Sequence, residues 1–240
     1  MTGAVRSSTP IMDAYDTWET TARNHNAGTF STEVLRMIER ILPKGMAASA
    51  ETGCGKSTVL LSNLSESHTV FALDDRNLDD SSVDFYESCP LTQLNRIETV
   101  FGPTQIMLPK HAHMRRYDLV LLDGPHGWPF PELEYYFLYP HIETGGLLIL
   151  DDCNIPTIAR MADILAEDAM WTLEGFASTT VIFRRTSAPL FDPTGDGWWE
   201  QRFNRRRVSP KRDIYLTDAS PLDIVSEARL DLTVFPAGKP

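Results

Sequence analysis

Cysteine is scarce in this sequence, and its placement excludes several kinds of site. The 240 residues contain three cysteines, Cys54, Cys89 and Cys153, which are odd in number and are never closely paired. Disulfide-stapled domains and cysteine-rich zinc sites need paired cysteines at short spacings. We therefore expect reduced thiols, as in a cytoplasm, and a fold that is held together by its core.

Basic residues are also in deficit, which argues against a nucleic-acid partner. Lysine and arginine number 22 against 33 aspartates and glutamates, and the formal net charge is -11. Binding to a phosphate backbone depends on clustered basic side chains. The one basic run, residues 202–212, is interpreted as a solvated face, so we expect no nucleic-acid partner.

Long hydrophobic runs are absent too. No stretch approaches the ~18 consecutive apolar residues of a membrane span, and the N-terminus lacks the apolar core of a signal peptide. The hydrophobic content of 42% is that of an ordinary globular chain. A chain of this length can bury a full core, so we expect one cytoplasmic α/β domain with appendages and no membrane contact.

The sequence does contain an alternation of short apolar runs with helix-like segments. Strand-like runs lie at 46–51, 69–74, 97–102, 117–123 and 145–152, and helix patterns lie at 55–64, 104–111, 131–142 and 157–169. Strands that are apolar throughout are typical of a parallel sheet covered on both faces by helices. The sequence therefore predicts a doubly wound, mostly parallel α/β sheet.

The two ends of this pattern differ from its middle. Residues 31–42 predict a covering helix behind a serine or threonine cap, with a buried face made of Val34, Leu35, Ile38, Ile41 and Leu42. The runs 171–176 and 179–186 are separated by only two residues, which is too few for a crossover, so they predict a terminal antiparallel hairpin. We divide the chain into N-terminal covering helices (1–45), a core (46–185) and a C-terminal appendage (186–240).

The turn after the first strand carries glycines that admit two interpretations. Residues 50–57 resemble the phosphate loop of ATP-binding enzymes, with Lys56 as the phosphate contact, although Ala50 replaces the first glycine. Alternatively, Gly53 and Gly55 let the backbone approach an adenosine cofactor. In that case Asp74, which lies 74 − 53 = 21 residues past Gly53, is near the ~20-residue spacing of a ribose-binding acid. The loop by itself leaves both interpretations open.

A stronger pattern lies at the ends of the two most apolar strands. The first ends in Asp123, followed three residues later by His126, and the second ends in Asp151 and Asp152. Adjacent strands would bring the three carboxylates to one rim, where they repel unless a divalent cation such as Mg²⁺ lies between them. The competing interpretation is that these aspartates only form turns and cap a helix. The combination of both acid clusters with His126 favours a magnesium site.

Together these motifs resemble a known family. The segment Glu51-Thr-Gly-Cys-Gly, the acid Asp74, the run 102–105, Asp123-x-x-His126 and Asp151-Asp152 are similar to motifs of class I S-adenosylmethionine-dependent methyltransferases. Within that family the sequence looks like the metal-dependent O-methyltransferases of catechol and sugar-modifying type. The resemblance covers roughly residues 28–185 and implies a seven-stranded, Rossmann-like sheet.

The resemblance also implies a role for each motif residue. Glu51, Gly53 and Gly55 would hold the methionine part of S-adenosylmethionine, Asp74 or its neighbour Asp75 the ribose, and Thr104 and Gln105 the adenine. Asp123, Asp151 and Asp152 would bind Mg²⁺. His126 stands where the catechol enzymes have a lysine base, and Asp152 where they have asparagine, so the sugar-hydroxyl enzymes are the better match.

We therefore expect an O-methyltransferase that acts on a hydroxyl of a small molecule, such as a sugar or a vicinal diol. His126 would be the general base, because an unperturbed histidine pKa of ~6.5 suits proton transfer near neutral pH. Trp128 and Phe130 are candidates for the acceptor pocket. Two alternatives stay open: an ATP-binding phosphate-loop enzyme that uses Ala50–Ser57, and a noncatalytic adenosine-binding module. The sequence leaves open whether the chain forms a homo-oligomer.

Overall fold

The computed structural model describes residues 10–19, 30–42, 45–191 and 195–207. Its strands are β1 (Met46–Thr52), β2 (Ser65–Ala72), β3 (Ile97–Phe101), β4 (Tyr117–Leu122), β5 (Ile142–Leu150), β6 (Trp171–Ala177) and β7 (Thr180–Arg185). Its helices are α1 (Ile11–Glu19), α2 (Thr32–Ile41), α3 (Lys56–Leu64), α4 (Ser82–Ser88), α5 (Thr104–His111), α6 (Phe130–Leu138), α7 (Pro156–Ala166) and α8 (Arg202–Arg207). Short 3-10 helices precede β3, β4 and β5, at Leu94–Arg96, Ala112–Met114 and Tyr139–His141.

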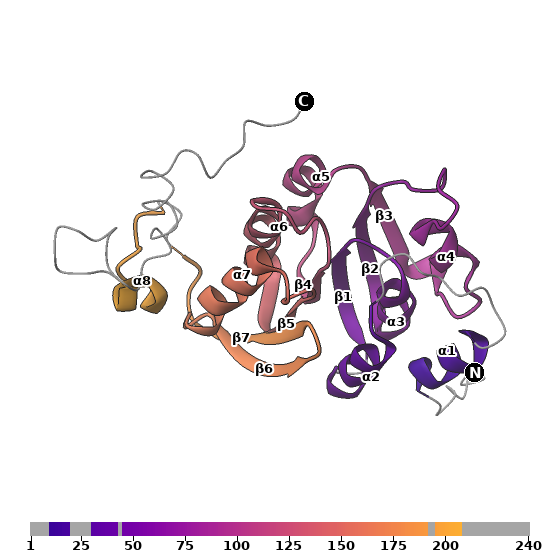
Figure 1. The fold of residues 1–240 in the computed structure, drawn as a ribbon, viewed down its shortest axis with the longest axis horizontal. Helices are drawn as coiled ribbons and strands as arrows, with labels where there is room; N and C mark the ends of the chain where they lie inside the picture. The colour runs from indigo at the N-terminus through magenta and orange to yellow at the C-terminus, as the bar shows by residue number, and fades with distance from the viewer. Residues whose placement is uncertain (1–9, 20–29, 43–44, 192–194, 208–240) are drawn as a thin grey trace, which may run out of the picture. The chain divides into compact units, whose positions relative to one another are not determined.

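The strands form one seven-stranded sheet in the order β3-β2-β1-β4-β5-β7-β6 (Figure 1). The pairings among β1 to β5 are all parallel, whereas β7 pairs antiparallel with both β5 and β6. The chain starts in the middle of the sheet at β1, runs outward to β3, and then returns to β4. This arrangement confirms the predicted doubly wound, mostly parallel sheet with a terminal antiparallel hairpin.

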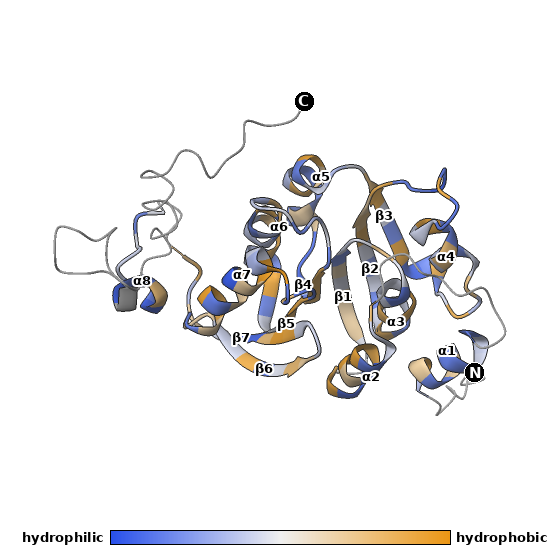
Figure 2. Ribbon diagram, viewed as in Figure 1, coloured by the Kyte–Doolittle hydropathy of each residue, from blue (hydrophilic) through white to orange (hydrophobic). Residues whose placement is uncertain are grey.

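Helices cover both faces of the sheet. Helices α1 to α4 pack against one another on one face, and α5 to α7 on the other (Figure 1). Leu119 and Leu121 of β4 join the core on the α1–α4 side, while the intervening Val120 and Leu122 are equally buried. Because successive side chains of a strand point to opposite faces, burial of both sets follows from this two-sided cover. Figure 2 shows the resulting hydrophobic residues along β5.

The N-terminal helix α2 forms where it was expected, with two differences in detail. Ser31 stands at the N-cap, but its side chain makes no capping hydrogen bond. Ile41, predicted to be buried, is 40% exposed. The helix ends there, and the chain turns to extended geometry at Leu42, which is buried instead. The backbone N–H groups of Ile11 and Met12 donate to the Glu39 carboxylate at 2.6 and 3.0 Å, so α2 caps the start of α1.

The strand ends differ from the predicted ones in a way that matters for the site. β2 begins four residues earlier than expected and ends at Ala72, so Asp74 lies beyond it. β4 and β5 end at Leu122 and Leu150, so the aspartates that follow lie just past the last paired residues. Hydropathy alone misplaces these ends, because pairing with a neighbouring strand decides where a strand starts and stops. The hairpin turn is likewise residues 178–179 and not 177–178.

The chain divides into two compact units, Met1–Pro189 and Leu190–Pro240. In the second unit, the rings of Trp198 and Trp199 meet edge-on with centroids 6.0 Å apart. Arg202 and Arg205 are exposed, and the rest of the predicted basic face lies outside the described side chains. The three cysteines are free. Among the described helices, none has the length and apolar character needed to cross a membrane.

Gly53, directly after β1, allows the closest approach between two loops at the sheet edge. Its φ is +82°, in the region that side chains rarely adopt. A Cβ atom built on Gly53 would lie 2.3 Å from the carbonyl oxygen of Asp123, which follows β4. A side chain at position 53 would therefore push the ends of β1 and β4 apart.

We predict that Gly53→Ala lowers the free energy of unfolding by roughly 2–4 kcal/mol, from left-handed backbone strain and overpacking together. Urea unfolding followed by circular dichroism measures this loss. Gly127→Ala is the matched control, because a Cβ at Gly127 meets nothing within 4 Å, and its expected change is within about 0.5 kcal/mol. Equal stability of the two variants would contradict the close approach.

Candidate functional site

The register of three neighbouring strands gathers the predicted motifs at one edge of the sheet. Thr52 of β1 pairs with Leu122 of β4, and Leu122 pairs with Leu150 of β5. The next residue of each chain segment is a predicted site residue, namely Gly53, Asp123 and Asp151. Their edge borders a cavity of about 680 Å³. Ligands in open α/β sheets bind at this carboxyl end of the strands.

Most of the predicted site residues line this cavity, but three do not. Those in its wall are Gly53, Thr104, Gln105, Asp123, His126, Asp151 and Asp152. Asp75 and Phe130 are in the wall as well, whereas Glu51, Gly55 and Asp74 are not. Trp128, the other acceptor-pocket candidate, lies on the surface and is 75% exposed.

Asp123, His126 and Asp152 converge on one point of the cavity wall. The Nε2 atom of His126 lies 3.2 Å from a carboxylate oxygen of Asp152 and 3.7 Å from one of Asp123. Contact with Asp123 is the main cause that raises the pKa of His126, and the charge of Asp152 adds to it. Burial raises the pKa of Asp123 to about 6, and its neighbours Asp151 and Asp152 add to this rise. The repulsion expected from the sequence is therefore present at Asp123.

The backbone of Asp152, one of the three converging residues, has an unusual conformation. Asp152 has a φ of +55°, in the left-handed region that aspartate adopts more readily than most residues. Its carbonyl oxygen accepts a hydrogen bond from the N–H of Ile155 at 2.8 Å, just before α7. The backbone N–H of Cys153 donates to the carbonyl oxygen of Thr179 in the hairpin turn at 2.8 Å. The turn after β5 is thus fixed from both sides.

Asp151 has a different environment from the other two aspartates. Its Oδ1 atom accepts hydrogen bonds from the hydroxyls of Thr179 and Thr180 at 3.2 and 2.6 Å, and its side chain is buried. Among the described residues, the group whose ligand atoms come within 4.8 Å of one another consists of Asp123, His126 and Asp152. The predicted set of three aspartates is therefore not the set that converges, because the β6–β7 turn holds one oxygen of Asp151.

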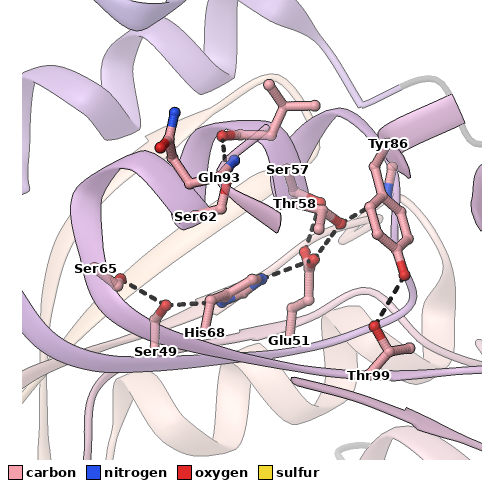
Figure 3. Close-up of polar contacts among 12 residues, drawn as sticks. Ser49, Glu51, Ser57, Thr58, Ser62, Ser65, His68, Tyr86, Gln93 and Thr99 are labelled. Carbon is pink, nitrogen blue, oxygen red and sulfur yellow. Dashed lines mark hydrogen bonds and ion pairs between the residues drawn. The ribbon is translucent and has the colours of Figure 1, made fainter. Parts of the chain in front are cut away.

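Glu51 lies in a buried polar network beneath the glycine loop (Figure 3). One carboxylate oxygen accepts a hydrogen bond from Ser57 at 2.6 Å, and the other accepts one from Thr58. The ring of His68 contacts the second oxygen at 3.0 Å, and both Glu51 and His68 are fully buried. Thr58 also accepts a hydrogen bond from the N–H of Gly55 at 2.9 Å. Glu51 thus holds the start of α3 and fixes the loop from below, away from the cavity.

The two acids that follow β2, Asp74 and Asp75, have different environments in the structure. Asp74 is half exposed and pairs with Arg76 at 3.2 Å. Asp75 lines the cavity, and its carboxylate accepts hydrogen bonds from the hydroxyl of Ser81 and the N–H groups of Ser82 and Val83. These hydrogen bonds lower the pKa of Asp75 despite the opposing effect of burial. Asp75, and not Asp74, is therefore the acid that borders the cavity.

Lys56, the phosphate contact of the ATP-binding alternative, already has a partner. Its Nζ atom lies 3.0 Å from a carboxylate oxygen of Glu19 at the end of α1, and both side chains are largely buried. The N-terminal helix α1 is therefore tied to the first residue of α3. Phe30, before α2, reaches the cavity wall.

Glu134 is a residue of the site region that sequence reasoning missed. It lies in α6 with 1% exposure, and its Oε2 atom accepts a hydrogen bond from Thr52 at 2.7 Å. Burial raises the pKa of Glu134 to about 7. A Cβ on Gly124 would lie 2.2 Å from Oε1, which explains the glycine beside Asp123. The only sequence signal for Glu134 is that an acidic residue stands within an apolar helix pattern.

The residues present fit a divalent cation. The Nε2 atom of His126 is buried and has no hydrogen-bond partner among the described residues, although two carboxylates lie beside it. Carboxylate oxygens suit Mg²⁺ or Mn²⁺, and an imidazole nitrogen suits the softer of these ions. A positive ion would also offset the repulsion from Asp151 and Asp152, which adds to the effect of burial on the pKa of Asp123.

The fold is that of O-methyltransferases of known structure. Comparison with models of protein families gives no match, and comparison with curated sequences gives none. The O-methyltransferase from Bacillus cereus, solved with S-adenosylhomocysteine, has 14% identity and a TM-score of 0.53, over 76% of this chain and 93% of that one. TomG from Streptomyces achromogenes, an O-methyltransferase of tomaymycin synthesis solved with S-adenosylmethionine, has 14% identity and a TM-score of 0.51, over 76% and 92%.

A third similar structure contains a metal ion. The MycE methyltransferase of the mycinamycin pathway, in complex with Mg, S-adenosylhomocysteine and mycinamycin VI, has 15% identity and a TM-score of 0.50, over 77% of this chain and 57% of that one. At these identities the likeness establishes the fold. The resemblance to class I S-adenosylmethionine-dependent methyltransferases is thereby confirmed at the level of the fold.

We predict that Glu134→Gln makes the protein more stable at alkaline pH. A carboxyl whose pKa is about 7 when folded and near 4.5 when unfolded favours folding while it is protonated, and this advantage is lost as the pH rises through 7. The glutamine variant keeps a neutral group. Its unfolding free energy relative to the native chain should rise by roughly 2–3 kcal/mol between about pH 5 and pH 8.

Denaturant unfolding in chelator at the two pH values measures this difference. Glu98→Gln is the control, because Glu98 forms an exposed ion pair with Arg115 and should change stability by less than about 0.5 kcal/mol at either pH. A pH-independent difference for Glu134→Gln would show that Glu134 titrates normally.

Proposed function

We propose that this protein is an S-adenosylmethionine-dependent methyltransferase that methylates a hydroxyl of a small molecule, with a sugar or another vicinal diol as the acceptor class. The observation that carries the proposal is the convergence of Asp123, His126 and Asp152 on the cavity wall. This group lies at the carboxyl edge of a sheet with an O-methyltransferase fold, next to the glycine turn at Gly53.

The cofactor is assigned to the part of the cavity between the glycine turn and α5. S-adenosylmethionine supplies a methyl group on a positively charged sulfur. Gly53 leaves its backbone open to the methionine part, and Thr104 and Gln105 at the start of α5 border the adenine side. Asp75 is the ribose acid in this proposal, in place of Asp74. Glu51 and Gly55 act from beneath, by holding the loop.

The divalent ion is assigned to Asp123 and Asp152, with Asp151 as the third predicted acid. When bound, the ion would orient the acceptor oxygens and lower the pKa of the hydroxyl to be methylated. Asp123 and Asp152 are exposed enough to offer oxygens to the cavity, whereas one oxygen of Asp151 is committed to Thr180. Residues 46–185 carry all of these groups, and Phe30 also lines the cavity.

His126 is proposed as the general base. Its Nε2 atom faces the two carboxylates and lacks a hydrogen-bond donor or acceptor of good geometry in the described residues. The proton of the acceptor hydroxyl would pass to this nitrogen, and the neighbouring carboxylates would stabilise the imidazolium that forms. The same geometry would also let His126 act as a metal ligand, and the two roles differ in their effect on metal affinity.

Both alternatives from the sequence fit the site less well. A phosphate-loop enzyme needs a free lysine, but Lys56 is paired with Glu19. A noncatalytic adenosine-binding module has no need for an imidazole between two carboxylates at the cavity wall.

Calorimetric titration tests the proposal directly. The purified full chain should bind S-adenosylhomocysteine in the micromolar range or tighter, and Mg-ATP weakly or not at all. Binding of Mg-ATP without binding of S-adenosylhomocysteine would refute the methyltransferase and favour the phosphate loop.

We predict that Lys56→Ala leaves the affinity for S-adenosylhomocysteine within a few-fold of the native value, because the loop would bind the cofactor through its backbone. In a phosphate-loop enzyme the same variant would lose its phosphate contact and its ATP binding. Glu19→Gln is the matched control, since it breaks the same ion pair and keeps the lysine. Loss of S-adenosylhomocysteine binding in Lys56→Ala but not in Glu19→Gln would count against the proposal.

We predict that His126→Ala lowers the turnover number on the order of 10²–10⁴-fold, the usual contribution of a positioned base. Its affinities for Mn²⁺ and S-adenosylhomocysteine should stay near native, and turnover should recover partly at high pH, where hydroxide can remove the proton. Asp152→Asn should instead lose Mn²⁺ affinity. Weak Mn²⁺ binding by His126→Ala would make His126 a ligand, and unchanged turnover would remove it from the mechanism.

A further inference from the structure

Beneath the sheet edge that carries Asp123, buried hydrogen bonds link the end of β1, helix α6 and the loop after β4. The hydroxyl of Thr52, at the end of β1, donates to Oε2 of Glu134 at 2.7 Å. The same hydroxyl oxygen accepts a hydrogen bond from the backbone N–H of Asp123 at 3.2 Å. That N–H also donates to the carbonyl oxygen of Thr52. Thr52 is fully buried and Glu134 is 1% exposed. Glu134 in α6 thus reaches the metal-ligand loop through one hydroxyl.

The other oxygen of Glu134 lies against the next residue of that loop. Oε1 lies so close to Gly124 that a Cβ there would come within 2.2 Å of it. The loop can therefore pass over the carboxyl group only with a glycine at this position. Glu134 contacts the backbone beside Asp123 on one side and supports its N–H, through Thr52, on the other.

A purely structural role does not account for an acid at this place. Burying a carboxyl group costs free energy unless its oxygens are hydrogen-bonded, and Oε1 of Glu134 has no hydrogen-bond partner among the described residues. A carboxyl group that lowers the stability of the fold is more typical of a functional site.

We infer that Thr52 and Glu134 are positioning residues for the divalent-ion site, where they fix the backbone from which Asp123 and His126 project. The inference rests on the ion site of the proposed function. Groups that hold metal ligands in place typically contribute 10–100-fold to metal affinity. The contribution of Glu134 to metal affinity comes from the hydrogen bond that it accepts from Thr52. Glutamine has the same shape and also accepts a hydrogen bond, so it should support the site equally well.

Mn²⁺ binding to the full chain, measured by calorimetry or electron paramagnetic resonance, tests this inference without an acceptor. Thr52→Val and Glu134→Leu should each weaken Mn²⁺ binding about 10–100-fold, and the double variant should bind no more weakly than the weaker single variant. Glu134→Gln should stay within a few-fold of native. S-adenosylhomocysteine affinity, measured in parallel, should change much less than Mn²⁺ affinity in all of them.

Thr99→Val is the matched control, because Thr99 lies on the edge strand β3, away from β4 and β5, and its hydroxyl is hydrogen-bonded to Tyr86 of α4. Its Mn²⁺ affinity should be native. Should Glu134→Leu fail to fold, Thr52→Val decides, since valine has nearly the same shape as threonine.

Three results would overturn the inference. Native Mn²⁺ affinity in Thr52→Val, additive losses in the double variant, or a loss in Glu134→Gln as large as in Glu134→Leu would each do so. If the native chain itself does not bind Mn²⁺, the ion site of the proposed function fails and this inference fails with it. Native binding that the variants leave unchanged refutes the inference alone.

Discussion

The parallel register of β1, β4 and β5 is the constraint on which the site depends. Because Thr52, Leu122 and Leu150 are in line across the sheet, the residue after each of them emerges at the same edge. That edge is crowded, and the strands can come this close only because Gly53 lacks a side chain against the carbonyl of Asp123. A shift of one residue in any of these pairings would turn a site residue to the other face of the sheet.

Negative charge is the second determinant of the site. The chain carries a net charge of -11, and part of that excess is concentrated in the cavity wall around Asp123 and Asp152. The imidazole of His126 is the one basic group in the converging set. Burial is the main cause of the raised pKa of Asp123, and the neighbouring carboxylates of Asp151 and Asp152 add to it. Such a wall favours cations as ligands. A sulfonium cofactor and a divalent metal ion both carry positive charge.

Much of the fold could be predicted from the sequence, because buried parallel strands are apolar throughout and turns carry recognisable residues. Asp123, His126 and Asp152 could be predicted as well, since they follow such strands directly. Less predictable were the hydrogen-bond partners of the other candidate residues, because these partners are distant in sequence. Glu51 is hydrogen-bonded by His68 and by two residues of α3, and Asp151 by Thr180 of β7. The contact between Glu134 and Thr52 spans 82 residues, and no local pattern encodes it.

The hairpin contact with Asp151 has a consequence for the order in which the chain can be completed. β7 inserts between β5 and β6, and its first residue, Thr180, supplies the hydroxyl that satisfies Asp151. The edge of β5 and the carboxylate of Asp151 therefore lack these partners until Thr180 and the rest of β7 have been synthesised. The cavity edge is thus completed by the last of the described strands, and a chain that stops before Thr180 lacks the hydroxyl that holds Asp151.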